Sequence, residues 1–331
     1  MSKPKVLLTG RIPGEVMARL AGVCDVEANT EDRPMDREKL IELIRDREGL
    51  ISMITDGVDG KMMDAAPRLK MIANMAVGFN NIDLKAATAR GIPVSNTPGV
   101  LTDATAELAF ALLLAAARRI PEMDRKTRAG EFRWWAPMLF LGREVSGKTL
   151  GIIGLGRIGK AVARRARGFD MRVLYCNPAR LDPAEERALR VEYADLRSLL
   201  READFVSLHV PLTEATKHLI GAEELALMKP TSYLINTSRG PVVDEKALVQ
   251  ALRGRKIEGA GLDVYENEPA LAPGLAELEN VTLLPHVGSG TLETRVRMAS
   301  LAVENLLAGL NGESPPNILN PEVLQAVYKN G

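Results

Sequence analysis

The sequence predicts an α/β protein with two doubly wound parallel sheets. Three observations support this fold class. Short apolar and β-branched segments alternate with longer helical patterns along almost the whole chain. The connections between them are short, which favours parallel sheets covered by helices on both faces. The chain has 331 residues, and a domain takes roughly 150 residues, so the length corresponds to two domains.

Nearly continuous apolar runs bounded by turn residues are typical of strands buried in a parallel sheet. Such runs predict strands at residues 6–10, 49–55, 70–77, 92–96, 150–156, 172–177, 205–210, 232–238, 259–264 and 281–285. Amphipathic patterns between them predict helices, for example over residues 37–47. Two of the predicted helices are long and cover residues 102–119 and 291–310.

The composition excludes several classes of protein. The 43 basic residues balance the 43 acidic residues, so no net charge attracts nucleic acid or an acidic membrane. The longest apolar run, residues 108–117, is about half the length that a bilayer-spanning helix needs. Only two cysteines, Cys24 and Cys176, occur, which provides neither a disulfide framework nor a cysteine-based zinc site. We expect a soluble, cytoplasmic protein without a metal site.

A glycine-rich turn follows the predicted strand near residue 150. Its residues match the pattern G-x-G-x-x-G and are Gly154, Leu155, Gly156, Arg157, Ile158 and Gly159. The glycines allow a tight turn and a close approach of the backbone to a pyrophosphate, which then faces the amino end of the following helix. We therefore expect a Rossmann-like dinucleotide-binding domain. An unliganded strand–turn–helix is the structural alternative.

The position of this turn indicates how the domains are arranged. Such a turn usually follows the first strand of a nucleotide-binding domain, yet here it lies in the middle of the chain. We expect residues 99–286 to form the dinucleotide-binding domain, inserted into a second domain made of residues 1–98 and 287–331. The two long helices would then carry the chain between the domains. Two consecutive domains would show similar turn and helix signals at their boundaries, so that arrangement remains an alternative.

The residues after the next strand bear on the choice of dinucleotide. In NAD-binding domains an acidic residue there binds the ribose 2′-hydroxyl. Here the strand leads to Asn177, which would not repel a 2′-phosphate, and Arg180 is placed to pair with one. This favours NADP(H), or the use of both NADPH and NADH. A solvated loop arginine is the alternative role for Arg180.

Three predicted strand ends carry residues suited to the reduction of a 2-oxo acid. Arg239 follows one strand, a group of acidic residues at 263–268 follows the next, and His286 follows the third. A guanidinium group can bind a carboxylate through two N–H groups. A histidine held by a neighbouring carboxylate can donate a proton to the oxygen of a ketone as a hydride arrives. Taken singly, each residue is as well explained by an ordinary structural role.

Five motifs give the chain a resemblance to a known family. They are GLGRIG (154–159), HVPLT (209–213), NTSRGPVVDE (236–245), GAGLDVYENEP (259–269) and LPHVGS (284–289). In this order and spacing they resemble the D-isomer-specific 2-hydroxyacid dehydrogenases. Residues 76–83 and 95–107 resemble the glyoxylate and hydroxypyruvate reductase branch in particular. The stretch from Asn177 to Arg180 departs both from the Ser/Arg-rich version of NADPH-using reductases and from the acidic version of NAD-using enzymes.

The resemblance implies roles for individual residues. Arg239 matches the catalytic arginine, Glu268 the glutamate that orients the histidine, and His286 the proton donor. Further positions are implied to contact the cofactor, namely Val210, Pro211, Thr237, Ser238, Asp263 and Gly288. Others are implied to contact the substrate, namely Met53, Val77, Gly78 and Trp135. Trp135 resembles an aromatic residue that reaches the pocket of a partner subunit in some members, although a tryptophan packed on its own loop is equally compatible with the sequence.

The leading interpretation is an NAD(P)H-dependent reductase that converts glyoxylate to glycolate and hydroxypyruvate to D-glycerate, with His286 as proton donor. We expect it to act as a homodimer and to bind neither nucleic acid nor a membrane. One alternative is a reductase of a bulkier 2-oxo acid such as hydroxyphenylpyruvate. Another is a nucleotide-sensing, corepressor-like binding protein on the same fold.

Overall fold

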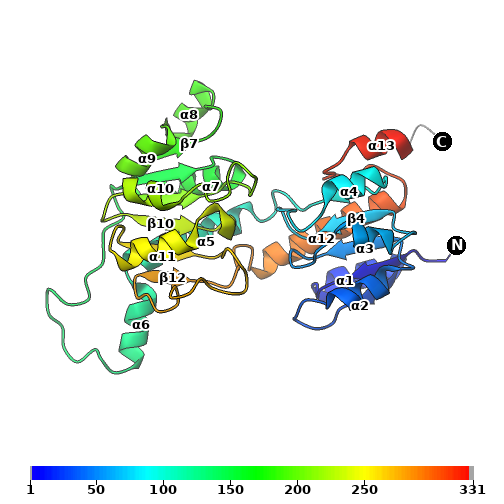
Figure 1. Cartoon of the computed structure of the whole chain (residues 1–331), viewed down its shortest axis with the longest axis horizontal. Coiled ribbons are helices and arrows are strands. Elements are labelled where there is room, and N and C mark those ends of the chain that lie inside the picture. The colour runs from blue at the N-terminus through cyan, green and yellow to red at the C-terminus, as the bar shows by residue number, and fades with distance from the viewer. Residues whose placement is uncertain (1, 328–331) are drawn as a thin grey trace. The chain divides into compact units, whose positions relative to one another are not determined.

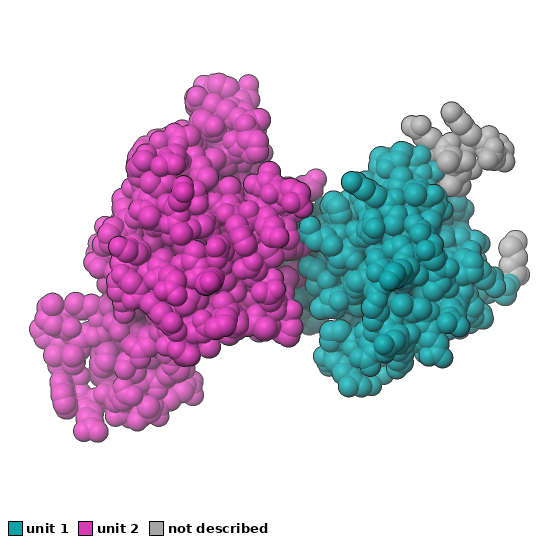
Figure 2. Space-filling view, in the orientation of Figure 1, with its two compact units in different colours: residues 1–101, 290–331 teal, residues 102–289 magenta. Residues whose placement is uncertain are grey.

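The computed structural model describes residues 2–327 and divides them into two compact units (Figures 1 and 2). Unit 1 contains residues up to 101 and from 290 onward, and unit 2 contains residues 102–289. The boundaries expected from the sequence, after residues 98 and 286, lie three residues earlier at each crossing. None of the helices in the described part of the chain is both long enough and apolar enough to span a bilayer.

Unit 1 is built on a five-stranded parallel sheet with the strand order β2-β1-β3-β4-β5. The strands are β1 (Lys5–Leu8), β2 (Asp25–Ala28), β3 (Gly49–Ser52), β4 (Met71–Asn74) and β5 (Val94–Ser95). The helices are α1 (Gly14–Val23), α2 (Arg37–Ile44), α3 (Gly60–Asp64), α4 (Leu84–Ala89), α12 (Leu292–Leu310) and α13 (Glu322–Val327).

Helix α12 packs closely on the sheet of unit 1 although it lies some 200 residues after it in sequence. Glycine makes this approach possible. A Cβ atom on Gly309 would lie 2.6 Å from the Sδ atom of Met71, and one on Gly49 would lie 2.9 Å from a methyl carbon of Leu306. Side chains of α2, α3 and α4 form an apolar cluster with strand residues such as Leu50. The C-terminal segment is therefore an integral part of the unit.

Unit 2 is built on a seven-stranded parallel sheet with the order β12-β11-β10-β9-β6-β7-β8. The strands are β6 (Thr149–Ile153), β7 (Arg172–Cys176), β8 (Glu192–Tyr193), β9 (Phe205–Leu208), β10 (Tyr233–Asn236), β11 (Gly259–Leu262) and β12 (Val281–Leu283). The α-helices are α5 (Thr102–Ala117), α6 (Ile120–Arg128), α7 (Arg157–Ala166), α8 (Pro183–Leu189), α9 (Leu196–Glu202), α10 (Ala222–Leu227) and α11 (Glu245–Arg253), and two 3₁₀ turns are η1 (Arg167–Phe169) and η2 (Gly240–Val242).

The strands of unit 2 are apolar on both faces, because helices cover both. Side chains alternate between faces along a strand, and β10 shows this directly. Tyr233 and Ile235 join the apolar cluster under α5 and α7, whereas Leu234 joins the cluster under α9, α10 and α11. Both clusters contain fully buried side chains. Burial on both sides explains why the strands read as continuous apolar runs.

The predicted fold class is confirmed, and every predicted strand segment overlaps a strand of the structure. Two strands, β2 and β8, were not predicted from the sequence. Both are at sheet edges, and their side chains are largely exposed. An edge strand with polar, solvated side chains lacks the apolar run on which strand prediction depends, so these two elements gave no signal.

Candidate active site

The loops after three neighbouring strands of unit 2 place the predicted catalytic residues at the carboxyl ends of these strands. Strands β10, β11 and β12 are adjacent and parallel, so their carboxyl ends lie side by side. Arg239 follows β10, Glu268 lies in the loop after β11, and His286 follows β12. In open α/β sheets, ligands bind beyond the carboxyl ends of the strands. The sheet thus places the three side chains where ligand chemistry occurs.

His286 and Glu268 form a hydrogen-bonded pair. The Nδ1 atom of His286 lies 2.8 Å from Oε2 of Glu268, while Oε1 of Glu268 accepts a hydrogen bond of 2.9 Å from the backbone N–H of Tyr265. With Nδ1–H donated to the carboxylate, Nε2 is the ring nitrogen left to exchange a proton with a ligand. About a third of each side chain is exposed, 31% for His286 and 35% for Glu268, so a ligand can reach the pair.

The protonation of Glu268 suits this role. Burial acts to raise the pKa of its carboxyl group, but the hydrogen bonds from His286 and Tyr265 and the positive charge of Arg239 outweigh burial and hold the pKa below its usual range. Glu268 is therefore an ionised acceptor at neutral pH. His286 itself adopts a left-handed backbone conformation, with φ of 55°. This conformation is uncommon for a residue with a side chain and is concentrated at functional sites.

Arg239 is half-buried beside this pair. Its backbone carbonyl accepts a hydrogen bond of 3.0 Å from the side chain of Asn236, which fixes the turn after β10. The next residue, Gly240, packs against the loop that leads to Glu268: a Cβ atom there would lie 1.8 Å from the backbone of Tyr265. Burial lowers the pKa of Arg239, and the nearby charge of Glu268 opposes this effect. A partly desolvated guanidinium of this kind binds a carboxylate strongly.

Asp263 holds the loop that carries His286. Its two carboxylate oxygens accept hydrogen bonds of 2.7 Å from the backbone N–H groups of Val287 and Gly288. The side chain is 1% exposed, and burial raises its pKa in spite of these hydrogen bonds and the charge of His286. The hydroxyl group of Tyr265 donates a hydrogen bond of 2.7 Å to the carbonyl of Leu284, just before the same loop. This supporting role of Tyr265 was not predicted from the sequence.

The glycine-rich turn has the geometry that a dinucleotide requires. Gly154 has a φ of 94°, and a Cβ atom on it would lie 2.7 Å from the backbone of His209. A Cβ atom on Gly159 would lie 2.4 Å from the carbonyl oxygen of Gly154, so α7 can pack closely on the turn only with glycine there. No side chain caps α7 at Gly156, and its first turn, which contains Arg157 and Ile158, has no acidic residue. The first backbone N–H groups of α7 are therefore available to bind an anion.

Buried polar atoms also lie just after the carboxyl ends of β9 and β10. The Oγ1 atom of Thr237, after β10, and the Nδ1 atom of His209, after β9, are buried and have no hydrogen-bond partner among the described residues. Burial lowers the pKa of His209 to about 4, so its ring is neutral and can donate or accept. Val210 and Pro211 follow directly after it, and Ser238 follows Thr237. Buried polar groups normally have partners, so these atoms fit contacts to a bound dinucleotide.

Comparison with known proteins identifies the family. The model of the D-isomer specific 2-hydroxyacid dehydrogenase, NAD binding domain matches residues 110–288. The chain is 51% identical to a glyoxylate reductase of Thermococcus litoralis over 97% of this chain and 98% of that protein. The chain belongs to the D-isomer-specific 2-hydroxyacid dehydrogenases. It is therefore an NAD(P)-dependent oxidoreductase.

Solved structures agree with this assignment. The crystal structure of a glyoxylate reductase from Paecilomyes thermophila matches with a TM-score of 0.86 and 36% identity, over 97% of this chain and 100% of that chain. An NADPH-dependent glyoxylate/hydroxypyruvate reductase from Sinorhizobium meliloti, solved in complex with NADP and malonate, matches with a TM-score of 0.84 and 34% identity. That match covers 96% of this chain and 97% of the other.

Asn177 and Arg180 of this dehydrogenase are both engaged with the protein itself. The side-chain oxygen of Asn177 accepts a hydrogen bond of 2.7 Å from the backbone N–H of Leu155 and so braces the glycine-rich turn. Arg180 forms a two-point ion pair with Glu186, at 2.8 and 2.9 Å, and lies 5.7 Å from the ring centroid of Tyr193. Together with Tyr175, Arg180 lowers the pKa of Glu186 to about 2. Arg180 is thus ordered by a carboxylate and is not simply solvated.

The substrate-contacting residues expected in unit 1 lie in the loops after β3 and β4. The backbone N–H of Met53 donates a hydrogen bond of 2.6 Å to the buried side chain of Asp56. Asparagine side chains bind the backbone carbonyls of the other two residues: that of Asn96 binds Val77 at 2.8 Å, and that of Asn74 binds Gly78 at 2.9 Å. These bonds fix the peptide groups of this loop in the dehydrogenase. Trp135, in unit 2, is 79% exposed.

Proposed function

We propose that this dehydrogenase reduces small 2-oxo acids, glyoxylate to glycolate and hydroxypyruvate to D-glycerate, with NADPH or NADH. The observation that carries the proposal is the pairing of His286 with Glu268 beside Arg239 at one sheet edge. The names of the relatives from Thermococcus litoralis and Sinorhizobium meliloti support the substrate class. When bound, the nicotinamide ring supplies the hydride.

The residues of the chain then have separate tasks. Arg239 binds the carboxylate of the 2-oxo acid and draws electron density from the neighbouring carbonyl. His286 donates the proton on Nε2 to the carbonyl oxygen as C2 receives the hydride, so the ketone becomes an alcohol. Glu268 accepts from Nδ1 throughout and keeps Nε2 directed at the oxygen. The neutral imidazole regains its proton from solvent.

We also propose that the loop of Val77 and Gly78 contributes backbone N–H groups to the substrate carboxylate, with Met53 beside it. A substrate with two or three carbon atoms offers few groups to hold beyond its carboxylate and carbonyl. Correct orientation therefore depends on fixed donors. The hydrogen bonds from Asn74 and Asn96 to this loop provide such rigidity.

The catalytic assignment predicts distinct kinetic losses. Replacing His286 with Ala removes the proton donor, so kcat for glyoxylate should fall by at least ~10²-fold. Replacing Arg239 with Ala removes the carboxylate ligand, so KM should rise strongly as well. His218→Ala is the matched control, because His218 pairs with Glu266 and has no task in the reaction. It should keep kcat within a few-fold.

Steady-state assays with glyoxylate, hydroxypyruvate and hydroxyphenylpyruvate check this proposal. Preference for hydroxyphenylpyruvate would replace the proposed substrates with a bulkier 2-oxo acid. No turnover of any of them with either cofactor would favour a corepressor-like binding protein. Near-normal kcat in His286→Ala would remove that residue from its role.

We propose that NADP(H) is the preferred cofactor, with NADH also accepted. Support comes from the end of β7, where Asn177 is uncharged and offers no repulsion to a 2′-phosphate. The ion pair with Glu186 uses the Nε and Nη2 atoms of Arg180, and a phosphate would be bound by Nη1. Because the carboxylate compensates its charge, Arg180 should contribute modestly.

Kinetics with both nucleotides test the cofactor preference. Arg180→Ala should raise KM for NADPH by roughly 3- to 10-fold and leave KM for NADH nearly unchanged, since one charge-assisted hydrogen bond is lost. Arg187→Ala, an exposed arginine on α8, is the control and should change neither value. A lower KM for NADH in the wild type, with no effect of Arg180→Ala, contradicts the preference.

We propose that the enzyme is a homodimer whose partner covers the segment at 131–142. This segment contains no helix or strand and exposes large apolar side chains: Phe132 at 57%, Trp134 at 65%, Trp135 at 79% and Met138 at 77%. Apolar residues gathered in this way mark interaction surfaces. In this arrangement Trp135 contributes to the substrate pocket of the partner.

Light scattering should give the mass of two chains for the wild type. The variant Trp135→Ser/Met138→Ser should shift the equilibrium toward one chain, because it removes apolar area from the interface. A wild-type protein that remains a single chain at micromolar concentration contradicts the dimer.

A further inference from the structure

Unit 1 holds a buried carboxyl group in the loop after β3. The residue is Asp56, which is only 4% exposed. The hydroxyl group of Thr9, the first residue after the neighbouring strand β1, donates a hydrogen bond to Oδ2 of Asp56. The backbone N–H of Met53 donates to the same oxygen atom at 2.6 Å. Donors from the carboxyl ends of two adjacent strands therefore converge on one carboxylate oxygen.

Burial affects the ionisation of this carboxyl group. It raises the pKa of Asp56, although the hydrogen bonds from Thr9 and Met53 act to lower the pKa. Placing a carboxyl group in the interior costs free energy unless its oxygen atoms are hydrogen-bonded. The two donors at Oδ2 offset part of this cost, and one of them is the peptide of Met53. The buried group therefore holds a loop that the proposed reaction places at the substrate.

Asn81 binds the same loop through its carbonyl groups. The Nδ2 atom of Asn81 donates hydrogen bonds of 3.1 Å to the backbone carbonyl oxygens of Met53 and Asp56. The backbone of Met53 is thus held on both sides, at its N–H by Asp56 and at its carbonyl by Asn81. Because that N–H is already bound within the chain, the side chain of Met53 is the part that remains for contact with a substrate.

Asn74, the last residue of β4, connects this loop with the loop of Gly78. The Oδ1 atom of Asn74 lies 3.3 Å from Nδ2 of Asn81 and accepts a hydrogen bond of 3.1 Å from the hydroxyl group of Ser52. The Nδ2 atom of Asn74 donates a hydrogen bond of 2.9 Å to the carbonyl of Gly78. Asn74 and Ser52 are both fully buried, so water does not compete for these bonds. A continuous chain of hydrogen bonds therefore leads from the loop of Asp56 to the peptide of Gly78.

We propose that Asp56 is a positioning residue of the substrate site. It holds the peptide of Met53 directly, and through Asn81 and Asn74 it restricts the peptide of Gly78. The backbone N–H groups of the second loop then keep one fixed geometry for the carboxylate of a substrate. This inference rests on the proposed function, which places the loops of Met53 and Gly78 at the substrate. Asp56 itself does not contact the substrate and acts only through these two loops.

Kinetics and inhibitor binding of Asp56→Ala test this role, with the full-length enzyme saturated with the reduced nucleotide that the wild type prefers. The KM for glyoxylate and the inhibition constant of oxamate, an unreactive analogue of a 2-oxo acid, should each rise roughly 10-fold or more, because the carboxylate donors lose their fixed positions. The KM for the nucleotide should stay within about twofold, since the glycine-rich turn belongs to unit 2. Asp56→Asn keeps an oxygen atom that accepts from Met53, so it should restore both constants to within about threefold of the wild type.

Asp59→Ala is the matched control for a general loss of stability. Asp59 is also in unit 1, but it caps α3 through the backbone N–H of Met62 and pairs with Arg37. It therefore lies outside the network of Asp56. The KM for glyoxylate and the inhibition constant of oxamate should stay within about twofold of the wild type in this variant, even if its melting temperature falls as far as that of Asp56→Ala.

The outcomes separate this inference from the proposed reaction. A rise of both constants in Asp56→Ala but not in Asp59→Ala supports the positioning role. If the wild type is active and Asp56→Ala leaves both constants unchanged, the positioning role alone is overturned. An equal rise in the two alanine variants overturns it as well, because lost stability then explains the effect. A wild type that neither turns over glyoxylate nor binds oxamate counts against the proposed reaction, and this inference fails with it.

Discussion

The hydrogen bond between Nδ1 of His286 and the carboxylate of Glu268 determines which proton transfer is available at the carboxyl ends of the unit 2 strands. It selects one ring nitrogen as the proton-exchanging atom and fixes where that atom points. Much of the surrounding structure maintains it. Asp263 binds the backbone after His286, and Tyr265 binds both Glu268 and the backbone before His286. Gly240 packs the loop of Arg239 against the backbone of Tyr265.

The sequence was sufficient to predict that Arg239, Glu268 and His286 lie close together, because each follows a buried strand. Apolar runs mark the strands, and in a parallel sheet all carboxyl ends lie at one edge. Glu268 and His286, which follow the adjacent strands β11 and β12, therefore come within hydrogen-bond distance although 18 positions separate them in the chain. The glycine-rich turn was predictable for a related reason: Gly154 and Gly159 stand where a side chain would clash with the backbone.

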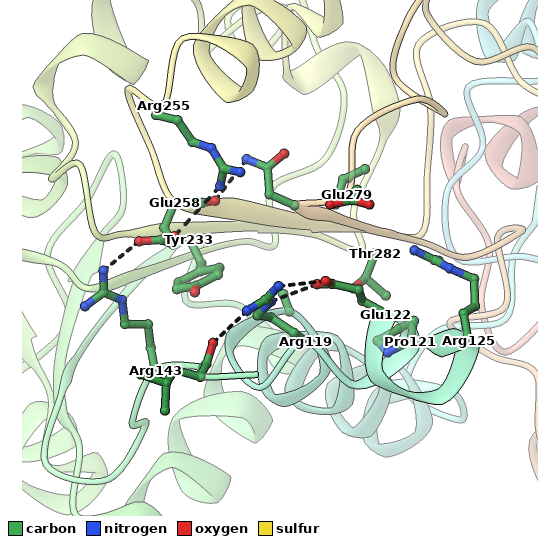
Figure 3. Close-up of a pocket in the computed structure, with 15 residues that line it drawn as sticks. Arg119, Pro121, Glu122, Arg125, Arg143, Tyr233, Arg255, Glu258, Glu279 and Thr282 are labelled. Atoms are coloured by element: carbon green, nitrogen blue, oxygen red, sulfur yellow. Dashed lines mark hydrogen bonds and ion pairs between the residues drawn. The ribbon is translucent and has the colours of Figure 1, made fainter. Parts of the chain in front are cut away.

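Other features depended on geometry that no local pattern encodes. The ion pair of Arg180 with Glu186 requires the loop after β7 to fold back on α8, and neither residue type predicts that path. Strands β2 and β8 are solvated edges without an apolar run. The pocket of unit 2 drawn in Figure 3 is lined by residues spread from Ala116 to Thr282 in the sequence, so no local motif marks it.

A double-mutant cycle on Glu268 and His286 tests the central interaction most directly. If Glu268 acts by orienting His286, the two residues form one unit, and their effects on kcat are not additive. Glu268→Gln should then slow the wild-type enzyme by roughly 10-fold or more, yet change the kcat of His286→Gln by less than about threefold. If Glu268→Gln slows His286→Gln by the same factor as it slows the wild type, the two side chains act separately and the proposed role of Glu268 is contradicted.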